Sequence, residues 1–246
     1  MPVKAKEEAA PAARFAGFPK AGMKFLRDLK KNNDREWFRE RKPLYEESVH
    51  VPMELVAREV AAGCRKRGFA LYAKEKNPVM RVYRDIRFSP DKRPFKTHVG
   101  CGLKHEQSKS SQGEVYIHIS PEESFFAAGF WMPERSFLQA WREAMASDRK
   151  KFQKALAALE KSGLALSRES TLTRLPRGFD AQAGSPLADI FKLTSYVVTR
   201  PVTAIEYTSP RLVGSAVDFA LAAKPLLEYG WSLNHAAKRD ILELDR

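Results

Sequence analysis

Three short segments in the middle of the chain alternate between apolar and polar residues and follow one another closely. They are residues 97–103, 114–120 and 124–131, which are separated by ten and three residues. Successive side chains of a β-strand point to opposite faces of a sheet, so this alternation predicts half-buried strands. Parallel neighbours need a crossover of about a dozen or more residues, and these connections are shorter. The segments therefore predict an antiparallel sheet.

Two further segments complete the predicted sheet. Residues 79–88 alternate in the same way, except that Arg84 falls on the otherwise apolar face. A cation in that position must be paired, at a strand edge or beside a bulge. Residues 195–205 are rich in β-branched residues, and they include Pro201, which cannot donate a ladder hydrogen bond. This last strand is therefore expected at an edge of the sheet.

Apolar residues at helical spacing predict helices before and after these strands. One helix is expected to begin at Asn33, which forms the pattern of a capping box with Glu36. A single long helix is expected after Pro133, and a last one after Ser209. The predicted fold class is α+β, a central antiparallel sheet covered by helices.

The length of 246 residues suits one domain. We expect a disordered tail over residues 1–13, a single α+β domain over residues 14–235 and a charged end over residues 236–246. No apolar stretch reaches the roughly 18 residues of a membrane span, and the first residues lack the apolar core of a signal peptide. These observations predict a cytoplasmic protein. Cys64 and Cys101 lie far apart and are expected to be buried thiols, so no metal site and no cofactor is predicted.

The segment from Arg81 to Lys96 places six cations among aliphatic and aromatic residues, in a chain whose formal net charge is +13. A disordered basic tail lacks such apolar residues, so we expect this segment to be folded and to hold its charges in place. A positive field attracts nucleic acid, nucleotides or phosphorylated metabolites. The candidate ligand-binding residues are Arg81, Arg84, Arg87, Lys92 and Lys96.

This basic segment has two interpretations. As an anion site, its arginines bind phosphate or carboxylate oxygens through paired hydrogen bonds, and its lysines add point charges. As a structural network, Asp85 and Asp91 pair internally with the cations and pin a hairpin. Asp85 is expected to hold an arginine in place, and Asp91 to do the same or to bind a metal. Two carboxylates cannot neutralise six cations, which favours the anion site.

A catalytic role is considered for His118 and Asp85. Tyr116 and His118 share the polar face of their strand, and His98 lies on the polar side of its own strand. If these strands are neighbours, the histidines lie beside the basic segment, where one of them can transfer a proton while arginines hold an anion. The alternative is that His118 is a structural residue with satisfied hydrogen bonds.

Two other features bear on a binding site. Trp131, at a strand end beside Gly129, is a candidate for stacking on a base or ring, although packing in the core is the commoner use of a tryptophan. The polar segment 104–113 is expected to be a mobile loop, which either closes over a ligand or is an ordinary surface loop.

The most specific motif of the chain is RDIRFSPDK, residues 84–92. Supporting residues occur from Phe15 to Leu233; they are Phe25, Leu26, Asn32, Asn33, Trp37, Phe38, Pro94, Lys96, Tyr116, Gly129, Pro133 and residues 174–179. In these positions the chain resembles the family catalogued as domain of unknown function 2461, with Phe95 where a tyrosine is expected. The resemblance implies a bacterial single-domain protein and implies no activity.

Three functional hypotheses remain open. The first is an anion-binding protein with its basic site at Arg81–Lys96, for a phosphate-bearing ligand or nucleic acid. The second is an enzyme that acts on a small phosphorylated or carboxylated substrate in a pocket formed by Arg84, Asp85, Arg87 and His118. The third is a structural protein whose charges are internally paired.

Overall fold

An antiparallel sheet forms the centre of the computed structural model, which describes residues 13–74, 77–87, 90–106 and 112–244, with side chains through residue 233. Within these residues the sheet has five strands in the order β1-β2-β3-β4-β5, so each strand pairs with its neighbour in the sequence. The strands are β1 Leu71–Tyr72, β2 Val99–His105, β3 Glu114–Ile119, β4 Phe125–Phe130 and β5 Tyr196–Pro201.

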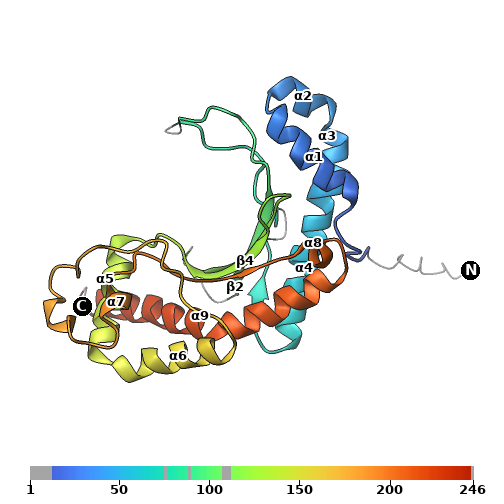
Figure 1. Ribbon diagram of the computed structural model, residues 1–246. Coiled ribbons are helices and arrows are strands. Elements are labelled where there is room, and N and C mark those ends of the chain that lie inside the picture. Colours follow the sequence, from blue (N-terminus) through green and yellow to red (C-terminus); the bar gives the residue numbers. More distant parts are fainter. Residues whose placement is uncertain (1–12, 75–76, 88–89, 107–111, 245–246) are drawn as a thin grey trace, which may run out of the picture.

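Helices surround this sheet on its convex side and at its ends, and the concave side stays open (Figure 1). The N-terminal helices are α1 Lys20–Lys31, α2 Arg35–Glu40, α3 Lys42–Tyr45, the π-helix Glu46–His50 and α4 Val51–Lys66. The later ones are α5 Arg135–Ser147, α6 Arg149–Lys161, the 3-10 helix Asp180–Gln182, α7 Ala188–Phe191, α8 Ala204–Tyr207 and α9 Arg211–Leu244. The long helix α9 contacts α4, α5, α6, β3 and β4, so it joins the helical layer to the sheet.

The core lies between the convex face of the sheet and helices α4 and α9. Alternate residues of the strands point into it, for example Cys101, Ile117 and Val198, none of which is accessible to solvent. Cys64 of α4 is equally buried, and both cysteines are free thiols, as predicted. Since these residues take one face of the sheet, the residues between them must face the concave side.

The α+β class and the strands over residues 97–103, 114–120, 124–131 and 195–205 are confirmed, with ends that differ by a few residues. No regular strand is found over the described part of residues 79–88, so that prediction is wrong. Val79 bridges to Cys101 of β2, and the chain then leaves the sheet.

The segment that leaves the sheet pairs with the segment that leads back to it. Tyr83 bridges to Phe95, and Lys96 donates a backbone hydrogen bond to Val82. We call residues 79–87 and 90–96 the basic arm; it projects on the concave side of the sheet (Figure 1). Alternation along the arm therefore reflects a narrow ladder rather than a strand of the sheet, and Met80, one of its apolar residues, is exposed. The two-residue strand β1 is too short for a periodic signal, and it was not predicted.

Two helix boundaries also differ from the prediction. Asp148 interrupts the long helix expected after Pro133, because its side chain accepts a hydrogen bond from the backbone N–H of Lys151 and caps α6. Asp34, rather than Asn33, caps α2. The last helix extends to Leu244, and the predicted tail over residues 1–13 lies almost wholly outside the described residues. None of the helices that the structure describes has both the length and the apolar character to cross a membrane.

Candidate ligand-binding groove

The concave face of the sheet is built from three rows of residues that lie side by side across the strands. The first row is Gly100, His118, Phe125 and Pro201; the second is Gly102, Tyr116, Ala127 and Thr199; the third is Glu114, Gly129 and Val197. Ala127 and Gly129 of β4 lie in the middle of the second and third rows, so larger side chains surround a low floor there.

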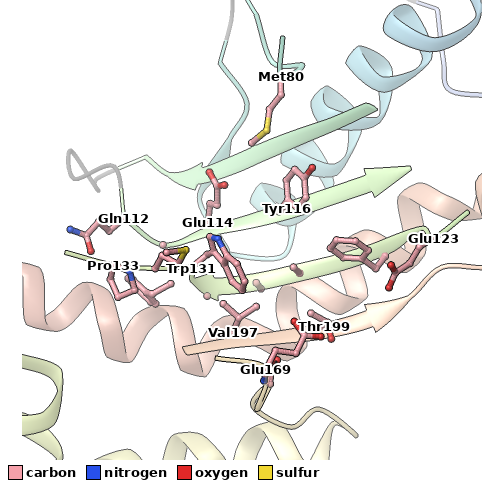
Figure 2. Close-up of a pocket in the computed structure, with 18 of the residues that line it drawn as sticks. Met80, Gln112, Glu114, Tyr116, Glu123, Trp131, Pro133, Glu169, Val197 and Thr199 are labelled. Carbon is pink, nitrogen blue, oxygen red and sulfur yellow. Dashed lines mark hydrogen bonds between the residues drawn. The ribbon is translucent and has the colours of Figure 1, made fainter. Parts of the chain in front are cut away.

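A groove of about 800 Å³ lies over this floor (Figure 2). Met80 of the basic arm borders it on one side, and Trp131, which follows β4, borders it on another. Glu169 lies across the groove, beyond β5 (Figure 2). The volume is in the range of pockets that hold small molecules.

The groove carries negative charge although the chain is strongly basic. Its described lining includes four glutamates and neither lysine nor arginine; the glutamates are Glu114, Glu123, Glu134 and Glu169. The chain as a whole has 43 Lys and Arg against 30 Asp and Glu. This local reversal of sign was not predicted, although the position of Glu114 on the same strand face as Tyr116 and His118 was available from the alternation.

Glycines of β2 make room for the two large polar side chains of β3. A Cβ atom on Gly102 would lie 2.6 Å from Oε2 of Glu114, and one on Gly100 would lie 2.5 Å from the hydroxyl of Tyr116. Burial raises the pKa of Glu114, against the opposing effect of Lys104 and Lys74. Burial also raises the pKa of Tyr116 to about 12.

Two histidines stack beside the groove. The rings of His98 and His118 are 4.2 Å apart, and the ring of His118 also stacks on Phe125 at 4.6 Å. Nδ1 of His118 lies 3.1 Å from the hydroxyl of Tyr116. Burial, together with nearby cations that include Lys96, lowers the pKa of both histidines to about 4. Both imidazoles are therefore neutral at pH 7.

In the basic arm, both aspartates bind arginines. Asp85 accepts two side-chain hydrogen bonds from Arg87, at 3.0 and 2.8 Å, and these lower the pKa of Asp85 to about 2. Asp91 binds both Arg93 and Arg84, which holds its pKa well below its usual range. Arg84, which was expected to need a partner because it falls on the apolar face of its segment, is thus paired with Asp91. The oxygens of Asp91 are occupied by arginines, and the described residues contain no cluster of three potential metal ligands.

The remaining candidates of the arm differ in their surroundings. Lys92 is exposed, and its amino group donates to the carbonyl of Ile86. Arg81 and Lys96 form no ion pair with a carboxylate in the described part of the chain. Burial lowers the pKa of Lys96, and the neighbouring Arg81 lowers it further. Arg81 also lines a smaller pocket of about 340 Å³ together with Lys42.

The arrangement brings together some of the predicted residues and separates others. The charge of Lys96 lowers the pKa of both histidines, and the charge of Arg84 lowers the pKa of His98. The described lining of this groove contains none of the four residues from which a pocket was expected, Arg84, Asp85, Arg87 and His118. Of the loop expected to close over a ligand, residues 107–111 lie outside the described residues.

A family model described as a conserved hypothetical protein, DUF2461, matches residues 21–229. The chain belongs to this DUF2461 family. No curated protein and no solved structure matches the chain. The match covers both the basic arm and the groove. In this DUF2461 protein the RDIRFSPDK motif supplies Arg84, Asp85, Arg87 and Asp91 of the ion pairs in the arm.

Proposed function

We propose that this DUF2461 protein binds a small ligand through an anionic group, which Arg81 and Lys96 hold at the arm side of the groove. The observation that carries the proposal is the close placement of these two cations. Lys96 is half-buried, which lowers its pKa, and the neighbouring charge of Arg81 lowers it further. Such an arrangement costs free energy in the absence of an anion, and a bound anion would remove that cost.

Phosphate and carboxylate groups suit the pair of cations formed by Arg81 and Lys96. An arginine offers parallel N–H donors to such oxygens, and a lysine adds a compact charge. His98 and His118 lie next to Lys96 in their neutral forms, so each retains one ring N–H as a donor. A bound anion would favour the protonated histidines, and we therefore expect affinity to increase as the pH falls from 7 toward 5.

A small ligand is supported better than nucleic acid. Asp85 and Asp91 already bind Arg84, Arg87 and Arg93, so these three arginines have carboxylate partners within the arm. The groove beside it is lined by carboxylates, which would repel a polyanion. A nucleic-acid interface needs a continuous basic stripe instead.

An enzyme that acts on the same class of ligand is the second candidate, and the contact between Tyr116 and His118 favours it. Neutral His118 can accept a proton from a bound molecule, although a pKa of about 4 makes it a weak base at pH 7. Asp85 is poorly suited to proton transfer, because Arg87 holds it in the ionised form.

The proposal can be tested by calorimetric titration with inorganic phosphate, hexyl phosphate and single-stranded DNA. We expect hexyl phosphate to bind the wild type, and Lys96→Met or Arg81→Gln to weaken this binding by at least about tenfold, since hydrogen bonds to charged groups are strong. Arg87→Gln is the matched control, because it removes the same charge from an arginine that already has a carboxylate partner. Equal losses in all three variants, or tighter binding of DNA than of the small phosphates, would contradict the proposal.

A further inference from the structure

The geometry of the groove points to a second recognition element in the same ligand: we propose that a primary ammonium group binds between Glu114 and Trp131, so that the ligand is an amino-substituted phosphate or carboxylate. This inference rests on the proposed function for the anionic end of the ligand. It is carried by the placement of the two side chains in the groove and by the sign of the charge there.

Trp131 is presented to the groove rather than packed in the core. Its side chain is 63% exposed, and it lines the groove as Glu114 does, two residues after Gly129, which pairs with Glu114 in the sheet (Figure 2). The next residue, Met132, has a φ of 40°, which is an uncommon conformation for a residue other than glycine. The backbone N–H of Met132 is held by the hydroxyl of Ser195, at 2.9 Å. Residues in such conformations often occur at ligand-binding sites, where the surrounding structure stabilises them.

An exposed indole beside a carboxylate is well suited to a cation. The face of an indole ring attracts ammonium groups, and the attraction increases when water is excluded. Glu114 supplies the countercharge, because its carboxylate is half-buried over Gly102 of β2 and Glu114 lines the groove (Figure 2). Burial makes the ionised form of this carboxylate costly, and a ligand ammonium would offset the cost. The other described charges of the groove lining are also carboxylates, so none of them opposes a cation.

The separation of the two ends sets the length of the ligand. Glu114 and His118 lie four residues apart on β3, which corresponds to about 13 Å along a strand. The side chain of Glu114 shortens this span, because its carboxylate lies over Gly102, the residue of β2 that pairs with Tyr116. Between the ends lie apolar surfaces of Ala127, Phe125 and Met80. Each methylene group of an extended chain adds slightly more than a third of the roughly 3.3 Å rise of a strand residue. A flexible linker of about six methylene groups therefore matches the shortened distance between the ammonium end and the anionic end of the site.

The test uses a matched pair of ligands, 6-aminohexyl phosphate and hexyl phosphate, in titrations at pH 7. An ammonium at the end of an alkyl chain weakens binding to an apolar surface, whereas a carboxylate partner strengthens it. We expect the aminohexyl compound to bind the wild type about tenfold more tightly, in line with a hydrogen-bonded charge pair. Shorter amino phosphates, such as 2-aminoethyl phosphate, should lose this advantage because they cannot reach both ends.

The variant Glu114→Gln preserves the shape of the side chain and should abolish the preference for the amino compound. Glu143→Gln, on the exposed side of α5, is the matched control and should retain the preference. Trp131→Leu changes an exposed residue and should reduce the preference about threefold without affecting folding. If Glu114→Gln fails to fold, the result for Trp131→Leu still decides the matter.

The inference is overturned if the wild type binds both compounds equally, or if the preference persists in Glu114→Gln and Trp131→Leu. Failure of the proposed function gives a different result, in which Lys96→Met changes the affinity for neither phosphate. A third compound, 6-aminohexan-1-ol, separates the two cases because it has the ammonium without the phosphate. Its binding should depend on Glu114 and be independent of Lys96.

Discussion

The conformation of a single residue, Gly129, shapes the centre of the groove floor. It lies within β4 and has a φ of 133°, and a Cβ atom there would overlap the carbonyl oxygen of Tyr196 on β5. We expect Gly129→Ala to destabilise the protein by about 2 kcal/mol or more, because both the backbone conformation and the close approach of β5 oppose a side chain. Urea unfolding followed by circular dichroism measures this change.

The control for this substitution is Gly214→Ala in α9, where an added Cβ would meet nothing within 4 Å. Alanine favours helix more than glycine does, so we expect this variant to be more stable than the wild type by up to about 1 kcal/mol. A similar destabilisation in both variants would show that the packing around Gly129 has no special role.

The two stacked histidines give the protein a specific dependence on pH. The pKa values of His98 and His118 are about 4 in the folded protein, whereas the ordinary value of a histidine, which applies to the unfolded chain, is 6.5. Between these values the unfolded chain binds more protons than the folded one, so the free energy of unfolding is highest above about pH 6.5 and decreases as the pH falls toward 4. The double variant His98→Asn and His118→Asn should have a flatter profile over this range. Urea midpoints from pH 7 to pH 4.5 test it, and an equally steep profile in the variant would exclude the histidines as the cause.

Among the structural elements, the basic arm depends on one side chain from outside it. Asn33 donates from Nδ2 to the carbonyl of Phe95 at 3.0 Å and accepts the N–H of Phe95 at 2.9 Å. The same phenylalanine stacks on Phe38 of α2, with ring centroids 4.2 Å apart. The arm is thereby attached to the corner between α1 and α2, which keeps Lys96 near the histidines.

Removal of this attachment should loosen the arm while the sheet stays intact. We expect Asn33→Ala to cost about 1–3 kcal/mol, because it leaves the backbone groups of Phe95 without partners. Hydrogen exchange should accelerate in residues 79–96 and remain unchanged in β3 and β4. Asn32→Ala is the matched control, since among the described residues the side chain of Asn32 is bonded only to the carbonyl of Asp28 on the surface of α1. Faster exchange across the whole protein would indicate global destabilisation instead.

At this scale the sequence predicted elements with local signals and failed where distant residues decide the structure. The alternation in β3 and β4 identified both strands, because each pairs with its sequence neighbour. Apart from Arg84, the alternation in residues 79–88 is as regular. Tyr83 nevertheless pairs with Phe95, which Asn33 holds by two hydrogen bonds, and the segment lies away from the sheet. A pattern of period two shows that two faces differ, and it does not identify the partner strand.

For the whole molecule, the net charge of +13 overstates the positive character of the candidate site. The excess of cations in Arg81–Lys96 was visible in the sequence, and so was the need for a partner for Arg84. The separation of Arg81 and Lys96 from the internally paired arginines was not visible, because it depends on the fold of the arm. The acidic lining of the groove was hidden for the same reason, since its glutamates come from segments that are distant in the sequence.

This distribution of charge predicts a modest dependence of binding on salt. A local site for one anionic group should lose less than about fivefold in affinity between about 50 and 200 mM salt, whereas proteins with 6–10 phosphate contacts on DNA lose about 10³–10⁵. Titration of hexyl phosphate at several salt concentrations measures the slope. A steep slope would indicate that the overall field, rather than the pair Arg81 and Lys96, attracts the anion.

The order of α9 and the strands along the chain has a consequence for biosynthesis. All strands of the sheet precede it, and it contacts α4, α5, α6, β3 and β4. Proteins are made from the N-terminus, so the meander can pair on the ribosome while its apolar side still lacks its principal cover. Nascent chains arrested before Arg211 are therefore expected to bind chaperones that recognise apolar surface. Release from these chaperones must await the synthesis of α9, so the core is completed only after all the described strands have been made.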